Sequence, residues 1–201
     1  MSFKDLRTKY VVEVATKLFL ERGIGDVTIK DIAVEADIGE ATIYRYFSKK
    51  TNIVLASALQ LKEKVFRGYF DLSKGKTGFE KIEIFYYSYL RIFERSPEYF
   101  YFINEFDAYM QMQNEVSLDE YEKQIDTFKA EYLEAYKLGQ KDGSIQRIDN
   151  IDTFYFSTTH ALLELCKKLS VKGALLKQDK NSKKAAELEC LIKVILASLQ
   201  K

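Results

Sequence analysis

Apolar residues at helical spacing run through nearly the whole chain, and residues that break helices are scarce. The 201 residues include one proline, Pro97, and nine glycines, which is too few for the turns of a β-sandwich or barrel. No segment shows the alternation of apolar and polar residues that marks a half-buried strand. The sequence therefore predicts an all-α fold of about nine helices.

The first 50 residues predict three helices in close succession. An apolar stripe over residues 11–19 predicts the first helix, which a glycine then ends. Thr28 and Asp31 have the spacing of a capping box and begin a helix of about two turns. A turn over 37–39 leads to a third helix over 40–46. Two short helices joined by a three-residue turn and braced by a longer helix are typical of a helix-turn-helix.

The third helix lies in the stretch TIYRYFSKK (42–50), which has three cations, two tyrosines and no acid. At about 100° per residue, Ile43 and Phe47 share the inward face and Arg45 points outward. An outward arginine can bind guanine or phosphate through paired N–H groups. We expect the DNA-binding residues to be Thr28, Gly39, Glu40, Ala41, Thr42, Tyr44, Arg45, Tyr46, Lys49 and Lys50.

The lysines at the start of the fourth helix have an unfavourable position for helix stability. Lys49 and Lys50 precede or begin a helix that Ser48 is expected to cap, where a cation opposes the helix dipole. A DNA phosphate at this point would account for them. A solvated cationic face is the alternative, and for Lys49 taken alone it is the simpler one.

The stretch TIKDIAVEADIGEATIYRYFSKKTNIV (28–54) resembles the DNA-binding head of the TetR family of bacterial transcriptional regulators. The resemblance covers residues 7–55. It departs where Asp37 replaces the usual turn glycine and where Gly39 replaces the usual serine before the recognition helix. The resemblance implies base contacts by Thr42, Tyr44 and Arg45, and phosphate contacts by Tyr46, Lys50 and Thr28.

We expect two domains, a helix-turn-helix DNA-binding domain over 1–50 and a larger helical ligand-binding and dimerisation domain over 51–201. The fourth helix is expected to end near Phe70, before a polar linker over 71–78. The later helices are expected at about 79–95, from Ser96 to the break at 111–117, at 119–141, at 151–171 and at 183–199. A polar loop, GALLKQDKNS (173–182), separates the last two.

Aromatic residues are concentrated between Phe79 and Tyr136, where 16 of the 28 rings lie. Consecutive rings over 99–102 cannot share one helix face. The excess favours a ring-lined cavity for a lipophilic or planar aromatic effector, and a bulky aromatic core is the alternative. The residues expected to bind it are Tyr86, Phe93, Phe102, Glu105, Phe106, Tyr109, Tyr132, Tyr136, Tyr155 and His160.

Two of these residues have plain alternatives. Glu105 could pair with a cationic ligand among the rings, or it could be an exposed helix acid. His160 could contact the ligand, or it could be a core histidine.

The last two predicted helices are apolar over more than half of their circumference, so one face can pack on the body while the other needs a partner. We expect a homodimer formed by a four-helix bundle. Two recognition helices would then occupy successive major grooves of an inverted repeat in double-stranded DNA. The residues expected at the interface are Phe154, Thr158, Leu162, Leu165, Leu188, Leu191, Ile192, Ile195 and Leu199.

Composition and spacing argue against several other classes. The net charge of +1 requires any basic footprint to be local. The N-terminus has no apolar signal, and no stretch reaches the ~20 apolar residues of a membrane span. One histidine and two distant cysteines make no zinc set, and no catalytic set or phosphate loop is visible. We expect a cytoplasmic protein that is not an enzyme and has no metal, cofactor or membrane partner.

The sequence favours a ligand-responsive DNA-binding regulator, acting as a repressor that a small molecule releases from its operator. The alternative keeps the DNA-binding head and makes the larger domain a docking platform for a protein partner.

Overall fold

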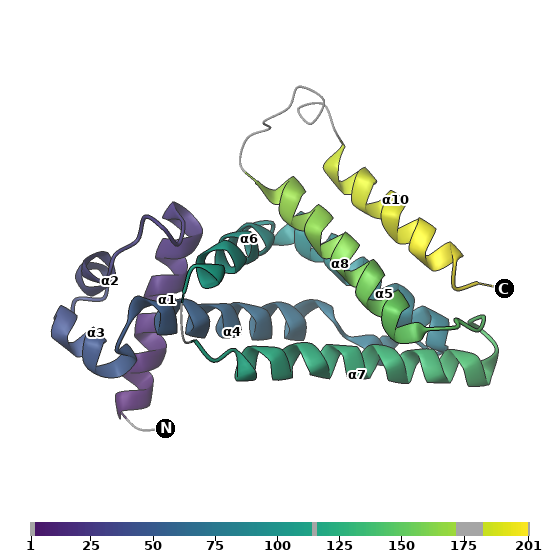
Figure 1. The fold of residues 1–201 in the computed structure, drawn as a ribbon, viewed down its shortest axis with the longest axis horizontal. Coiled ribbons are helices and arrows are strands. Elements are labelled where there is room, and N and C mark those ends of the chain that lie inside the picture. Colours follow the sequence, from purple (N-terminus) through teal and green to yellow (C-terminus); the bar gives the residue numbers. More distant parts are fainter. Residues whose placement is uncertain (1–2, 114–115, 172–182, 201) are drawn as a thin grey trace. The chain divides into compact units, whose positions relative to one another are not determined.

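The computed structural model describes residues 3–113, 116–171 and 183–200. These residues form nine α-helices and one short 3-10 helix, with no strand among them (Figure 1). The prediction of an all-α fold is confirmed; the loop predicted over 173–182 lies outside the described residues. The helices are α1 (Phe3–Arg22), α2 (Ile29–Glu35), α3 (Glu40–Phe47), α4 (Lys50–Tyr69), η1 (Leu72–Lys74), α5 (Gly78–Arg95), α6 (Glu98–Gln111), α7 (Asp119–Asp142), α8 (Ile151–Ser170) and α10 (Lys184–Ala197).

The chain folds into two compact units. The first unit consists of Met1–Lys64 together with Tyr101–Tyr121. The second consists of Val65–Phe100 together with Glu122–Lys201. The expected boundary after residue 50 falls at the first residue of α4, within the first unit.

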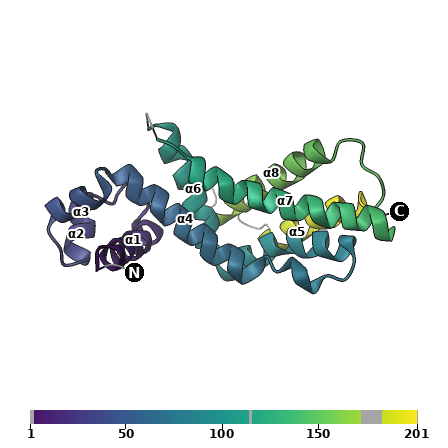
Figure 2. The same ribbon diagram turned by 90° about the horizontal axis from the view of Figure 1, so that it is seen from below.

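In the first unit, α2 packs against both α1 and α3 (Figure 2). Gly23 ends α1 in the left-handed conformation, with φ of 95°, and its N–H donates to the carbonyl of Phe19. A glycine adopts this conformation without steric cost, so the chain can turn sharply out of the helix. Leu18, Ile32 and Ile43, one from each helix, are buried in the core that these helices share.

The turn between α2 and α3 depends on Asp37, whose φ is 53°. Asp tolerates the left-handed region better than most non-glycine residues. The aspartate at the usual glycine position is therefore compatible with the helix-turn-helix geometry. The N–H of Ile38 donates to the carbonyl of Ala33, which closes the turn.

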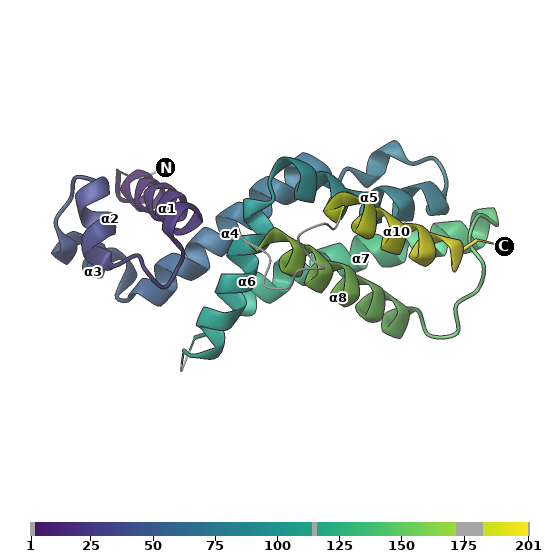
Figure 3. The same cartoon turned by 90° about the horizontal axis from the view of Figure 1, so that it is seen from above.

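In the second unit, α10 lies against α5 and α8 (Figure 3). Thr77 caps α5 through a capping box with Glu80, in which each residue accepts a hydrogen bond from the other's backbone N–H. Near this end, Gly78 closely approaches Gly139 of α7, and a Cβ at Gly78 would lie 2.0 Å from the backbone nitrogen of Gly139. Among the described residues, none of the helices combines the length and apolarity needed to span a bilayer.

Candidate nucleic-acid interface

The two faces of α3 differ sharply in exposure. Ile43 is fully buried and Phe47 is 7% exposed, whereas Tyr44 is 49% exposed. Ala41 and Arg45 are also exposed. The predicted inward placement of Ile43 and Phe47 is confirmed, and α3 presents a polar, partly aromatic edge to solvent. The major groove of DNA admits an α-helix, and side chains of these types can contact base edges there.

The start of α3 has no side-chain cap, because Gly39 occupies the N-cap position. The first backbone N–H groups of a helix have no partner within it. Glu40 and Ala41 follow and are exposed, while Thr42 is half-buried beside them. This end of α3 combines exposed backbone donors with one carboxylate that repels phosphate or accepts a hydrogen bond from cytosine.

Cations surround the phenol of Tyr46. The Arg45 guanidinium carbon lies 5.4 Å from the centre of the Tyr46 ring. Hydrogen bonds from Arg45, and to a smaller extent from Arg7, lower the pKa of the Tyr46 phenol. Arg7 comes from α1 and Arg45 from α3, so the two helices place positive charge together at this edge. The involvement of Arg7 was not predicted from the sequence, since a lone arginine near the N-terminus carries no motif.

The predicted cap of α4 was wrong. Ser48 is the C-cap of α3, with φ of 62° and its N–H donating to the carbonyl of Tyr44. The α4 helix begins at Lys50, so the preceding position belongs to Lys49, which is exposed. A residue in the left-handed conformation ends a helix and cannot also hold the extended geometry of an N-cap.

Lys50 differs from the other expected phosphate contacts. Its ammonium donates to the backbone carbonyl of Ile24 and lies 5.4 Å from the centre of the Tyr109 ring. Burial lowers the pKa of Lys50, and the nearby Asp26 and Asp31 partly offset this effect. The side chain is half-buried and is used to hold α4 to the loop after α1.

Thr28 also has a structural role. Its hydroxyl accepts a hydrogen bond from Asp31 N at 3.1 Å, and the Asp31 carboxylate accepts one from Thr28 N at 2.7 Å. The predicted capping box is confirmed. Hydrogen bonds from Thr28 are the main reason that the pKa of Asp31 is lowered.

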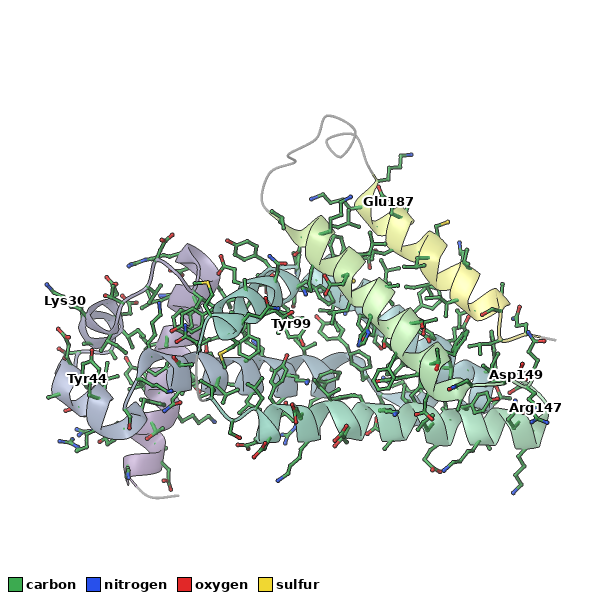
Figure 4. The ribbon with its side chains drawn as sticks, in the orientation of Figure 1. Lys30, Tyr44, Tyr99, Arg147, Asp149 and Glu187 are labelled. Atoms are coloured by element: carbon green, nitrogen blue, oxygen red, sulfur yellow. The ribbon has the colours of Figure 1, made fainter. Side chains whose placement is uncertain are left out.

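Lys30, in the first turn of α2, is an exposed cation that is not among the predicted DNA-binding residues. Figure 4 shows Lys30 and Tyr44 projecting from α2 and α3 at the end of the first unit that these helices form. The sequence contains the same signal for Lys30 as for Lys49, which is a lysine at the start of a helix, where its charge opposes the helix dipole.

The residues expected to bind an effector fall into both compact units. In the second unit, the hydroxyls of Tyr86 and Tyr132 are 3.1 Å apart, and Tyr86 is 2.6 Å from the Thr158 hydroxyl. The rings of Tyr132 and Tyr155 are 5.0 Å apart. Burial raises the pKa of Tyr86 and of Tyr155 to about 12. These residues form a buried cluster of rings in which the hydroxyls of Tyr86 and Tyr132 already have partners.

The other expected residues of the second unit are more scattered. Tyr136 is buried and accepts a hydrogen bond from Ile148 N at 2.9 Å. Phe93 is buried against the ring of Phe100. His160 is exposed, not a core histidine, and its ring lies 5.6 Å from that of Phe156.

In the first unit, the rings of Phe102 and Phe106 stack at 6.3 Å, and the Tyr109 hydroxyl is 3.4 Å from that of Thr51. Glu105 is half-buried and accepts hydrogen bonds from Ile24 N at 2.7 Å and from the Tyr101 hydroxyl at 2.7 Å. This carboxylate is therefore engaged by the protein itself.

The residues expected at the dimer interface differ in burial. Phe154, Thr158, Leu165 and Leu191 are half-buried. The remaining five are buried within the second unit, because α10 packs on α5 and α8; they are Leu162, Leu188, Ile192, Ile195 and Leu199. A different residue, Val194 of α10, is 64% exposed. Val194 is thus the apolar side chain of α10 that is most accessible to a partner, and it was not among the predicted interface residues.

Neither cysteine is in a disulfide, and only Cys166 is buried. Burial raises the pKa of its thiol well above the usual range. No group of three or more potential ligands that could hold a metal occurs in the described part of the chain.

Comparison with known proteins agrees with this geometry. Residues 11–57 match the family model for bacterial regulatory proteins of the tetR family. None of the curated proteins compared matches the sequence.

Many solved structures share the fold. A TetR family transcription regulator from Marinobacter aquaeolei VT8 is 20% identical, with 98% of this chain and 97% of that chain covered and a TM-score of 0.62. One from Agrobacterium tumefaciens is 12% identical, with 98% and 100% covered and a TM-score of 0.74. The ketosteroid transcriptional regulator KstR2 of Mycobacterium tuberculosis is 15% identical, with 97% and 95% covered and a TM-score of 0.66.

Residues 11–57 are therefore similar to the DNA-binding module of the tetR family, and nearly the whole chain shares the fold of these solved TetR-family regulators.

Proposed function

We propose that the protein is a cytoplasmic, ligand-responsive repressor that binds an inverted-repeat operator as a homodimer and leaves it when a small lipophilic or aromatic molecule binds. The observation that carries the proposal is the exposed edge of α3, where Tyr44 and Arg45 face solvent while Ile43 and Phe47 are buried. On this proposal the protein acts by binding and not by catalysis.

The proposed DNA contacts follow from the position of each side chain. Ala41 allows close approach of α3, and Thr42, Tyr44 and Arg45 reach base edges. Phosphates are bound by Tyr46, Lys49 and Lys30. Lys50 and Thr28 act indirectly, because Lys50 holds the start of α4 and Thr28 holds the start of α2.

The structure of the first unit supports a route for the response. The backbone between α1 and α2 is held at Ile24 from two sides: Glu105 of α6 accepts from its N–H, and Lys50 of α4 donates to its carbonyl. A shift of α6 or α4 on effector binding would therefore move the loop that precedes α2. A coupling of about 1–3 kcal/mol between the two sites changes DNA affinity by about 5–150-fold.

The direct test is titration of the purified protein onto its own upstream DNA by fluorescence anisotropy at several salt concentrations. Replacing Arg45 by alanine is expected to weaken specific binding by about 1–3 kcal/mol. Arg95→Ala, which removes the same charge from the exposed end of α5, should leave it unchanged. Absence of saturable, salt-sensitive binding to an inverted repeat would contradict the proposal.

A further inference from the structure

The core-facing stripe of α1 continues past the edge of the core. Val11 and Leu18 are each 1% exposed, and Val14 between them is half-buried. Arg7 precedes Val11 by four residues and Leu18 by eleven, so it lies on the same face of the helix. Arg7 itself is exposed, one turn before the buried part of α1. The packing of α1 therefore turns this arginine toward the rest of the first unit.

Tyr46 lies at the corresponding edge of α3. It directly precedes Phe47, which is buried in the core, and its own side chain is half-buried. The phenol oxygen of Tyr46 accepts hydrogen bonds from Arg45 and from Arg7. The guanidinium carbon of Arg45 lies 5.4 Å from the centre of the Tyr46 ring. The phenol is thus held between a side chain of its own helix and one of α1.

These contacts restrict what the Tyr46 hydroxyl can bind. A phenol offers one O–H donor and an oxygen that accepts. Because two guanidinium groups donate to the oxygen, its acceptor capacity is in use, and the O–H remains available as a donor. Hydrogen bonds from Arg45 and Arg7 also lower the pKa of the phenol, so the O–H donates more strongly. A suitable ligand must accept a hydrogen bond, and the two cations favour an anion.

Arg7 could act at this edge in two ways. It could contact a DNA phosphate directly, as an independent cation, or it could hold Tyr46 in place for that contact. Its position on the inward face of α1 and its hydrogen bond to the phenol oxygen favour the second role. Arg45, in contrast, is on the exposed face of α3 and keeps the base contact proposed above.

We propose that Arg7 is a positioning residue for DNA binding, which holds the Tyr46 hydroxyl so that its O–H donates to one backbone phosphate in each half-site. The inference rests on the proposed DNA-binding function. It assigns to that function a residue of α1, which lies outside the two short helices of the helix-turn-helix. Through Arg7, the start of α1 fixes the phosphate contact of α3.

A double-mutant cycle separates the two roles of Arg7. Affinity is measured by fluorescence anisotropy on the inverted repeat found in the protein's own upstream DNA. Tyr46→Phe should weaken binding by about 10-fold and Arg7→Ala by about 3–10-fold, because a charge-assisted hydrogen bond is lost. In the Tyr46→Phe background, Arg7→Ala should cost less than about twofold, because its effect passes through the hydroxyl.

Two further variants control for charge and folding. Lys9→Ala removes an exposed cation from the opposite side of α1 and should change affinity by less than about twofold in either background. Arg7→Lys keeps one charged donor and should recover part of the affinity only while Tyr46 is present. Thermal unfolding followed by circular dichroism verifies that each variant is folded.

Neutral phosphates test the contact from the side of the DNA. The phosphates of the inverted repeat are replaced one at a time by methylphosphonates. In the wild-type protein, one position in each half-site should weaken binding by about 10-fold, and the same replacement should cost less than about twofold in Tyr46→Phe and in Arg7→Ala.

Additive losses for Arg7→Ala and Tyr46→Phe would show that Arg7 acts independently and would overturn the inference. Unchanged affinity of Arg7→Ala would overturn it as well. In both cases specific binding by the wild-type protein leaves the proposed function intact. Absence of specific binding by the wild-type protein would overturn the proposed function together with the inference.

Discussion

Individual side chains in this protein often have roles that their type and position in the sequence do not reveal. Lys50 was expected to bind phosphate, yet it donates to the carbonyl of Ile24. No role was predicted for Lys62 from the sequence, yet its side chain is buried. A lysine in a helical stripe reads as an exposed residue, because only the packed neighbours determine whether its ammonium reaches water.

The burial of Lys62 predicts a specific pH dependence of stability. Its pKa is about 7 in the folded protein, against about 10.4 for an ordinary lysine. Between these values the unfolded chain binds more protons, so the free energy of unfolding rises with pH. Lys62→Met should be more stable than wild type at pH 6, and this advantage should shrink by about 1.4 kcal/mol per pH unit between pH 7 and 9.

Chemical denaturation of both proteins at each pH measures this difference, and the other titrating groups cancel in the comparison. Lys64→Met should parallel the wild type throughout. A constant difference between wild type and Lys62→Met across this range would show that Lys62 keeps an ordinary pKa.

At the scale of helices, most elements could be located from the sequence because their signals are local. The capping box at Thr28, the left-handed glycine after α1 and the turn at Asp37 all appear as predicted. The start of α4 could not be placed, because Ser48 suits both a helix start and a helix end. Its left-handed backbone, which ends α3, decides between them.

The crossing of α5 and α7 predicts a strong effect of a single methyl group. A Cβ at Gly78 would lie 2.0 Å from Gly139 N and 2.4 Å from Ala135 O, which are backbone atoms that cannot move independently. Gly78→Ala should lower the free energy of unfolding, measured by urea denaturation, by about 1–3 kcal/mol or more. Gly68→Ala, in α4 where a Cβ meets nothing within 4 Å, should instead stabilise it by about 0.5–1 kcal/mol. Equal effects of the two substitutions would contradict the close helix contact.

The attachment of α6 to the loop after α1 depends on the Glu105 carboxylate. Removing it by Glu105→Ala deletes the acceptor of Ile24 N, and a hydrogen bond to a charged group contributes about 1.5–3 kcal/mol. The Ile24 amide should exchange with solvent faster, and the free energy of unfolding should fall by about that amount. Glu98→Ala, an exposed acid of the same helix, is the control. Unchanged exchange at Ile24 in Glu105→Ala would show that this contact does not hold the loop.

At the scale of the whole molecule, the sequence was least informative about which apolar face is internal. Helices α8 and α10 are apolar over a wide arc, and periodicity alone cannot say which half packs on α5. The buried half includes Leu188 and Ile192, whereas Val194 remains 64% exposed. The density of aromatic residues was ambiguous in the same way, because it does not say whether the rings line a cavity or fill the core. In the structure, the hydroxyls of Tyr86 and Tyr132 are hydrogen-bonded to each other.

The exposed Val194 of α10 allows a test of how dimer formation and DNA binding are linked. If the proposed homodimer forms through α8 and α10, Val194→Asp places an unpaired carboxylate in its apolar interface, which is costly. Sedimentation velocity should then show monomers at concentrations where the wild type is dimeric. Affinity for the inverted repeat should fall toward that of a half-site, because one recognition helix contacts only one major groove. Ile125→Asp, the same change at an apolar residue of α7 that is 39% exposed, should preserve both properties. A dimeric Val194→Asp protein would place the subunit contact on another surface.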